Sequence, residues 1–192
     1  MDPSNVRTAD VILKAAELIR RQGFEATTVN EISKATGLTK GGLYHYLTGK
    51  RDLLYQIMRF GMDMLQQDVV DRVRDIEEPE EQLRTLIRLH VELIAKGKGA
   101  LTTLQEEVQG LEPKHRRAIL AQKREYFDFV RGMVERLAKK RRLRNLDTAV
   151  ATFSILGMVL FFARWYREKG ALDPSQIGDQ IAEIAIGGIL RR

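Results

Sequence analysis

The residues in this sequence that are best suited to contact a phosphate or a base lie between positions 39 and 50. Two adjacent glycines in the first turn of a helix each cost about 1 kcal/mol relative to alanine, so they are expected where the backbone must approach a ligand closely. Tyrosine and lysine, which follow them here, are side chains that contact phosphates. The set consists of Thr39, Lys40, Gly41, Gly42, Tyr44, His45, Tyr46 and Lys50.

These residues also have a plainer interpretation. Tyr44 and Tyr46 could be packing residues, and Lys50 could be a solvated charge. For one residue alone the two interpretations are equally good. The whole set favours binding to nucleic acid, because the glycines, the aromatic hydroxyls and the cation occur together.

Two short helices are expected to position this set. Thr28 and Glu31 have the spacing of a capping box, so a helix should begin after Thr28 and end at Gly37. Thr39 should cap the next helix, Lys40 to about Leu47. Because only Gly37-Leu38-Thr39 separates them, the pair has the helix-turn-helix pattern, whose second helix enters the major groove by its N-terminal end.

The remainder of the chain also has apolar residues at helical spacing, and alternating β-branched residues are absent. The predicted fold class is therefore all-α. Proline or a capping residue marks the start of several helices. We expect helices over Thr8–Gln22, from a cap at Thr48 to about Arg74, over Pro79–Lys96, Leu101–Gln109, Pro113–Arg142 and Asp147–Lys169, and from Asp173-Pro174-Ser175 to about Leu190.

The composition is that of an ordinary soluble protein, with 44% hydrophobic and 30% charged residues among 192. No cysteine is present, which excludes a disulfide framework, a thiolate metal site and a cysteine nucleophile. The polar N-terminus lacks the apolar segment of a signal peptide. The longest nearly apolar stretch, Ala149–Ala163, is shorter than the roughly 20 residues of a membrane span. We expect a cytoplasmic protein without a membrane partner, in which this stretch is a buried core helix.

Charge is unevenly distributed along the chain. The net charge is +6, but residues 1–50 carry only +2 and residues 114–144 carry +9. A basic protein suits a nucleic-acid partner. Because most of the basic excess lies outside the predicted DNA-reading segment, the local motif is the stronger argument.

Catalytic and metal-binding patterns are absent from the sequence. The three histidines, His45, His90 and His115, lie far apart and do not have a metal-binding spacing. We find no nucleophile–base pair and no cofactor loop, so we expect no catalytic residues, no metal, no cofactor and no enzymatic activity. Two alternatives remain: a helical hydrolase with a hidden site, or a helical carrier of a lipid or a partner protein. The glycine-bearing turn at residues 39–42 argues against a carrier.

The segment Gly23–Lys50 resembles the N-terminal domain of the tetracycline-repressor (TetR) family, although Leu47 and Gly49 depart from the usual pattern. The resemblance covers about a quarter of the chain. It implies a homodimeric transcriptional repressor whose two heads bind one palindromic operator in double-stranded DNA. It also implies that Thr28 faces DNA together with the set between residues 39 and 50. We therefore expect a helix-turn-helix DNA-binding domain over residues 1–50 and a ligand-binding and dimerisation domain over residues 51–192.

The last predicted helix is a candidate for the dimer interface. Its apolar stripe consists of Ile177, Ile181, Ile184 and Gly188. With the helix Asp147–Lys169 it would form a four-helix interface between two subunits. The alternative is that the stripe packs only inside its own subunit.

The segment Phe161–Arg167 resembles, over a short length, family members that sense fatty-acyl or related coenzyme A thioesters. This resemblance implies an effector site with an apolar tunnel and nearby cations, and release of DNA by the small molecule. The candidate contacts are His90, Arg124, Phe127, Phe161 and Trp165.

Two of the candidate contacts have alternatives that remain open. Arg124 lies four residues before Asp128, as Arg131 does before Glu135, so both arginines could belong to an ordinary salt-bridged surface. His90 could be a core histidine with satisfied hydrogen bonds.

Overall fold

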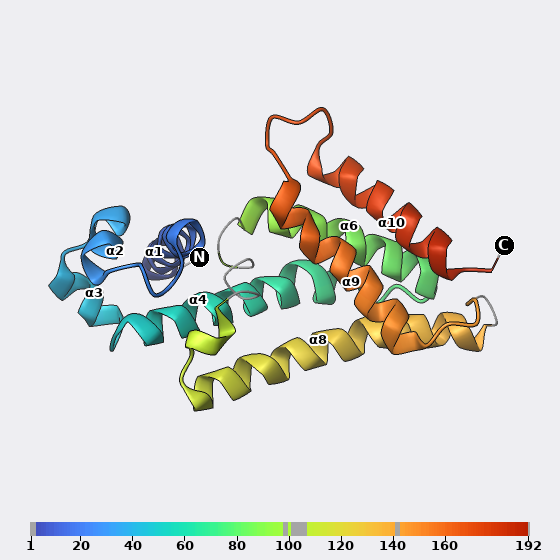
Figure 1. Ribbon diagram of the computed structural model, residues 1–192, viewed down its shortest axis with the longest axis horizontal. Coiled ribbons are helices and arrows are strands. Elements are labelled where there is room, and N and C mark those ends of the chain that lie inside the picture. Colours follow the sequence, from blue (N-terminus) through green and yellow to red (C-terminus); the bar gives the residue numbers. More distant parts are fainter. Residues whose placement is uncertain (1–2, 98–99, 101–106, 141–142, 192) are drawn as a thin grey trace. The chain divides into compact units, whose positions relative to one another are not determined.

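The computed structural model describes residues 3–97, 100, 107–140 and 143–191, and within these ranges the regular elements are helices (Figure 1). The predicted all-α fold class is confirmed. An isolated antiparallel bridge pairs Leu143 with Leu190. The helices are α1 (Pro3–Gln22), α2 (Val29–Thr36), α3 (Lys40–Tyr46), α4 (Lys50–Leu65), the π turn η1 (Gln66–Val70), α5 (Asp71–Val73), α6 (Pro79–Gly97), the 3-10 turn η2 (Val108–Gly110), α8 (Pro113–Lys139), α9 (Thr148–Trp165) and α10 (Pro174–Ile189).

The described residues divide into two compact units. The first comprises residues 1–63 with 97–122, and the second comprises residues 64–96 with 123–192, so that the chain passes between the units inside α4, at the last residue of α6 and inside α8. The boundary predicted after residue 50 stays a prediction.

In the first unit, α1, α2 and α3 gather around the N-terminal part of α4 (Figure 1). The core is apolar and includes Ala15, Ile19, Leu54 and Ile57, each at most 1% exposed. Full burial of a leucine or isoleucine contributes about 1.5–3 kcal/mol. Gly23 ends α1 with φ of 83°, a conformation that glycine adopts without a steric penalty.

The segment that precedes α8 is tied to this same core. The backbone N–H of Phe24 donates a hydrogen bond to the carboxylate of Glu107 at 3.0 Å. A Cβ at Gly110 would lie 3.1 Å from side-chain atoms of both Phe24 and Leu54. These contacts hold the turn between α1 and α2, which leads into the helix-turn-helix pair α2 and α3.

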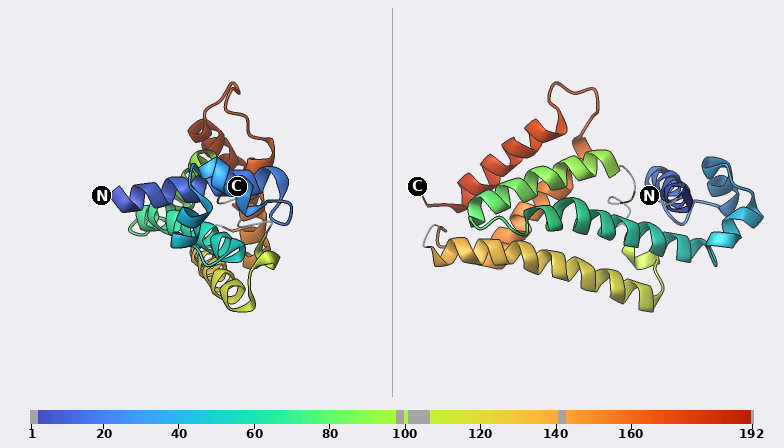
Figure 2. Two further views of the ribbon diagram at one scale, coloured as in Figure 1. Left: turned by 90° about the vertical axis from the view of Figure 1, so that its left-hand side faces the viewer. Right: turned by 180° about the vertical axis from the view of Figure 1, so that it is seen from behind.

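In the second unit, α10 runs along α6, as two opposite views show (Figures 1 and 2). The two helices approach closely at Gly178, where a Cβ would lie 2.8 Å from the Cα of Arg88. Arg84 of α6 pairs with Glu183 of α10 at 3.0 Å. Residues 123–139 of α8 pack against the N-terminal half of α9, where the rings of Phe127 and Phe153 lie 4.4 Å apart.

Several helix boundaries differ from the predicted ones. Gly49, and not Thr48, occupies the N-cap of α4, because the Gly49 carbonyl accepts the first helical bond, from Leu53 N–H. The N–H of Thr48 instead donates to the carboxylate of Asp52 at 2.9 Å. The predicted helix Leu101–Gln109 falls mostly outside the described residues.

The long helix predicted to end near Arg74 contains the π turn η1. This turn adds one residue to the helical repeat. Val69 and Val70 are adjacent in the sequence, and both are buried. Both valines therefore pack in the core at the point where the helical repeat widens.

The predicted core helix α9 is buried along only one face. Ile155, Val159 and Phe162 are fully buried, whereas Phe153 and Phe161 are 66% and 64% exposed. The expectation that the stretch is a buried core helix was therefore wrong for the face that carries Phe153 and Phe161. By length and composition alone, α9 is also apolar enough to cross a membrane.

Candidate nucleic-acid interface

The N-terminus of α2 is fixed by the predicted capping box, which is confirmed. The hydroxyl of Thr28 accepts a hydrogen bond from Glu31 N–H, and the Glu31 carboxylate accepts one from Thr28 N–H at 2.8 Å. The Thr28 hydroxyl also donates to that carboxylate at 2.7 Å. These hydrogen bonds from Thr28 lower the pKa of Glu31. The first short helix therefore begins at a defined residue.

The turn between α2 and α3 is equally well defined. Gly37 ends α2 in the left-handed conformation, with φ of 70°. The Ser33 hydroxyl donates to the carbonyl oxygen of Leu38, and Leu38 N–H donates back to the Ser33 carbonyl. Thr39 then caps α3, because its hydroxyl accepts from Gly42 N–H at 3.0 Å. Local hydrogen bonds thus set the angle between the two helices.

The first turn of α3 is open to solvent. Thr39, Lys40 and Gly41 are exposed. A Cβ at Gly41 would meet only the Thr39 hydroxyl, at 4.0 Å, whereas one at Gly42 would lie 3.3 Å from that hydroxyl. Packing inside the helix-turn-helix domain therefore partly explains the glycine at position 42. It does not explain the glycine at position 41.

The remaining predicted contacts differ in their surroundings. Tyr44 is 55% exposed, which argues against a purely packing role. His45 and Tyr46 belong to α3, but their side chains lie outside the described part of the structure. The ammonium of Lys50 lies 3.1 Å from the carbonyl oxygen of Glu25 and 4.4 Å above the ring of Phe24. Lys50 therefore joins the start of α4 to the turn before α2, a contact that the sequence did not indicate.

In the second unit, His90 has the surroundings of a core histidine. It is 2% exposed, and its Nδ1 lies 2.8 Å from the hydroxyl of Tyr126. Burial lowers the pKa of His90 to about 4, so the ring is neutral at pH 7. Phe127, the next predicted effector contact, is also buried.

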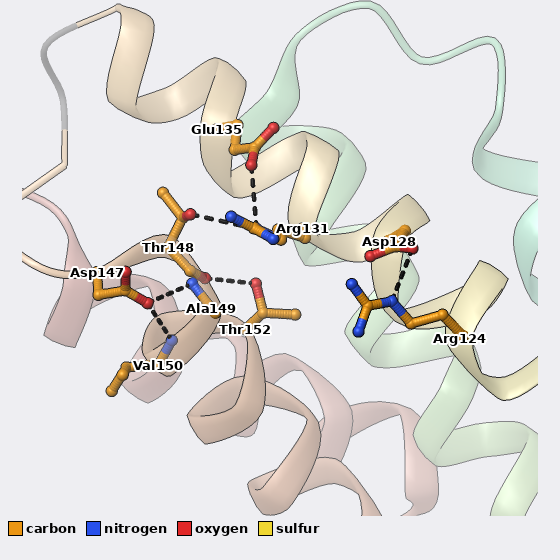
Figure 3. Close-up of polar contacts among 9 residues, drawn as sticks. All are labelled: Arg124, Asp128, Arg131, Glu135, Asp147, Thr148, Ala149, Val150 and Thr152. Carbon is orange, nitrogen blue, oxygen red and sulfur yellow. Dashed lines mark hydrogen bonds and ion pairs between the residues drawn. The ribbon is translucent and has the colours of Figure 1, made fainter. Parts of the chain in front are cut away.

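Arg124 belongs to an ion-paired face of α8 (Figure 3). It pairs with Asp128 at 2.9 Å, and Arg131 pairs with Glu135 at 3.0 Å. Arg131 also lies 3.4 Å from the hydroxyl of Thr148, at the start of α9. The salt bridges considered as an alternative for this stripe are thus present.

The predicted effector contact Phe161 lies on the exposed face of α9. The second, Trp165, is half-exposed, and its ring packs edge to face against buried Phe162 with centroids 5.3 Å apart. Of the predicted dimer residues on α10, Ile184 and Gly188 are exposed, Ile181 is half-buried and Ile177 is buried in its own subunit. Two exposed apolar residues of α9, Val150 and Phe153, were not predicted. Their spacing with residues 157 and 161 follows one helical face, but the opposite face is apolar too, so the sequence did not mark which face is exposed.

Comparison with known proteins places this chain in a family. Residues 11–57 match the description "Bacterial regulatory proteins, tetR family", and residues 77–189 match "Tetracyclin repressor-like, C-terminal domain". The chain belongs to the tetR family. It is a transcriptional regulator and not an enzyme, which confirms the family and the regulatory function predicted from the sequence.

Several known proteins match this chain over nearly its whole length. A crystal structure of AibR in complex with isovaleryl coenzyme A and operator DNA is 35% identical, with a TM-score of 0.84, and the match covers 93% of this chain and 97% of that one. The structure of the ketosteroid transcriptional regulator KstR2 of Mycobacterium tuberculosis is 26% identical, with a TM-score of 0.86, covering 95% and 94%. The fatty acid metabolism regulator protein of Bacillus subtilis is 21% identical, covering 93% of each chain.

Proposed function

We propose that this chain is a cytoplasmic, ligand-responsive repressor that binds a palindromic DNA operator as a homodimer and is released from it by an acyl-coenzyme A thioester. The observation that carries the proposal is the open first turn of α3. Lys40 and Gly41 are exposed there, and packing within the head gives no reason for glycine at 41.

The proposed DNA contacts follow from the placement of α3. Its N-terminal turn would enter the major groove, with Lys40 at base edges and the backbone of Gly41 close to the DNA. Tyr44 and Lys50 would contact phosphates on the flanking strand. Because the head carries a net charge of only +2, operator affinity should depend on these placed contacts and on two heads binding together.

The proposed dimer interface is the exposed apolar face shared by α9 and α10, helices that pack together. Phe153 and Phe161 of α9 and Ile184 of α10 are each about two-thirds exposed. Large apolar side chains gathered in this way mark an interaction surface. A second copy of the same face would cover them and form a four-helix interface. We therefore assign Phe161 to dimerisation in preference to effector binding.

The proposed effector class rests on the similarity to AibR, which was crystallised with isovaleryl coenzyme A and operator DNA. The acyl chain would bind in the second unit, whose core is largely apolar. Release requires the thioester to bind more tightly to a conformer whose two heads do not match the operator spacing. A ligand with equal affinity for both conformers would leave DNA binding unchanged.

Selection of bound sites from random DNA with the full-length protein tests this proposal. We expect a palindrome, and we expect isovaleryl coenzyme A or a longer acyl ester to weaken operator binding at least tenfold while free coenzyme A does not. If a palindrome is selected but no acyl ester changes its affinity, the effector class is wrong and the DNA-binding function stands. Failure to select any sequence would favour the helical carrier.

A further inference from the structure

A polar pair lies in the largely apolar core of the second unit. His90 comes from α6 and Tyr126 from α8, and their rings meet edge to face with centroids 5.4 Å apart. Leu86, Ile87 and Val130 nearby on the same helices are fully buried. Polar side chains in such a core destabilise the protein unless all their hydrogen bonds are made. The pair therefore stands out from the apolar side chains around it.

The protons of this pair determine which kind of ligand atom could bind to it. Burial keeps the imidazole of His90 neutral at pH 7 and raises the pKa of Tyr126, so the phenol keeps its proton. Together the two side chains have one N–H and one O–H, and their shared hydrogen bond uses one of them. The other donor, at His90 Nε2 or at the Tyr126 hydroxyl, has no partner among the residues that the structure describes. This donor can therefore bind an acceptor on a ligand.

A cation lies one helical turn from this pair. Lys123 precedes Tyr126 by three residues, so both lie on the same face of α8. Its side chain is half-buried, burial lowers its pKa, and it has no ion pair within the described ranges. Two arginines of α8, Arg124 and Arg131, have carboxylate partners instead. A half-buried ammonium without an ion pair suits an anionic ligand.

We propose that His90, Tyr126 and Lys123 form the polar recognition element of the effector site. The spare donor of the His90–Tyr126 pair binds the carbonyl oxygen of the acyl thioester, and Lys123 binds an anionic group of the same ligand. This inference rests on the proposed function and adds the atoms that would recognise the thioester. Ligand binding would give this donor an acceptor, which apolar contacts with the acyl chain alone cannot do.

The test compares isovaleryl coenzyme A with its thioether analogue, which lacks the carbonyl oxygen, by calorimetric titration of the full-length protein. The His90→Phe/Tyr126→Phe double variant removes the donor whichever atom carries it. Replacing both partners of a hydrogen bond with apolar groups of similar shape is nearly neutral for stability, so the variant should fold and bind operator. We expect the wild-type preference for the thioester, about five- to tenfold, to disappear while thioether affinity stays unchanged.

Two further variants separate the contribution of the His90–Tyr126 pair from that of Lys123. Tyr55→Phe removes a tyrosine hydroxyl in the first unit and should leave the preference intact. Lys123→Gln should weaken both ligands by a similar factor, about fivefold to tenfold, and keep the preference. If the double variant retains the thioester preference, the inference is wrong and the proposed function stands. If the wild-type protein binds no acyl ester and another ligand releases the DNA, both the effector class and this inference are wrong.

Discussion

Gly41 is the residue at which helix stability and DNA approach favour different side chains. Alanine at this position would meet only the Thr39 hydroxyl at 4.0 Å, so Gly41→Ala should raise the free energy of unfolding by up to about 1 kcal/mol. The added methyl should lower operator affinity by about tenfold, because it blocks the proposed backbone approach to DNA. Chemical denaturation and a DNA titration measure the two effects.

Gly132→Ala in α8 is the matched control for this prediction. A Cβ at Gly132 has no neighbour within 4 Å. The control should gain stability and bind operator as the wild type does. Wild-type operator affinity in Gly41→Ala would show that the backbone at this position does not approach DNA.

His90 should make stability depend on pH. The folded-state pKa is lowered from 6.5 to about 4, so the unfolded chain binds a proton at this residue below pH 6.5 and the folded chain binds it only near pH 4. The contribution of neutral His90 to the free energy of unfolding is fully present above pH 6.5. It is lost as the pH falls towards 4, and the total loss is about 3 kcal/mol. Denaturant unfolding of wild type and His90→Gln at fixed protein concentration checks this. Parallel pH curves for the two proteins would contradict it.

The sequence predicted those residue contacts that are local. The Thr28 and Thr39 caps join atoms three residues apart, so their spacing was sufficient. The contact of Lys50 with the Glu25 carbonyl spans 25 residues, and the His90–Tyr126 bond spans 36. Such pairings depend on how helices pack, and no spacing rule identifies them in one sequence.

Among the helices, α9 shows where sequence periodicity stops being informative. Its position was predicted because the whole stretch is apolar and Asp147 caps it, with a side chain that accepts from Ala149 and Val150 N–H (Figure 3). An amphipathic helix shows by its polar face which side is exposed. This helix has no such face, so the exposure of Phe153 and Phe161 could not be predicted.

The crossing of α6 and α10 should depend on Gly178. A Cβ there would lie 2.8 Å from the Cα of Arg88, and backbone cannot move aside as a flexible side chain can. Gly178→Ala should therefore lower the free energy of unfolding by about 1–3 kcal/mol, against the usual gain from alanine in a helix. Denaturant unfolding alongside Gly132→Ala measures the difference. Equal stability changes in the two variants would mean that the helices are not in close contact at this residue.

For the whole molecule, the central expectation is that two copies act together. Ile184→Glu places a charge at an exposed apolar position of α10, where a second copy is proposed to pack. The variant should fold, lose dimer mass in analytical ultracentrifugation and bind a palindrome at least tenfold more weakly, because one head carries too few contacts. Leu120→Glu, an exposed apolar residue of α8, is the control and should remain dimeric. A dimeric Ile184→Glu protein would place the interface elsewhere.

The most direct test of the account is the affinity of the full-length protein for its selected operator after the Tyr44→Ala and Lys50→Ala changes are combined. Loss of both phosphate contacts should lower the affinity at least tenfold for every sequence, and it should make the dependence on salt shallower by about one phosphate contact per subunit for the lysine. Lys96→Ala, which removes an exposed charge from α6, should change neither quantity. Unchanged operator affinity in the Tyr44→Ala/Lys50→Ala protein would contradict the assignment of α3 and the start of α4 as the DNA-reading head.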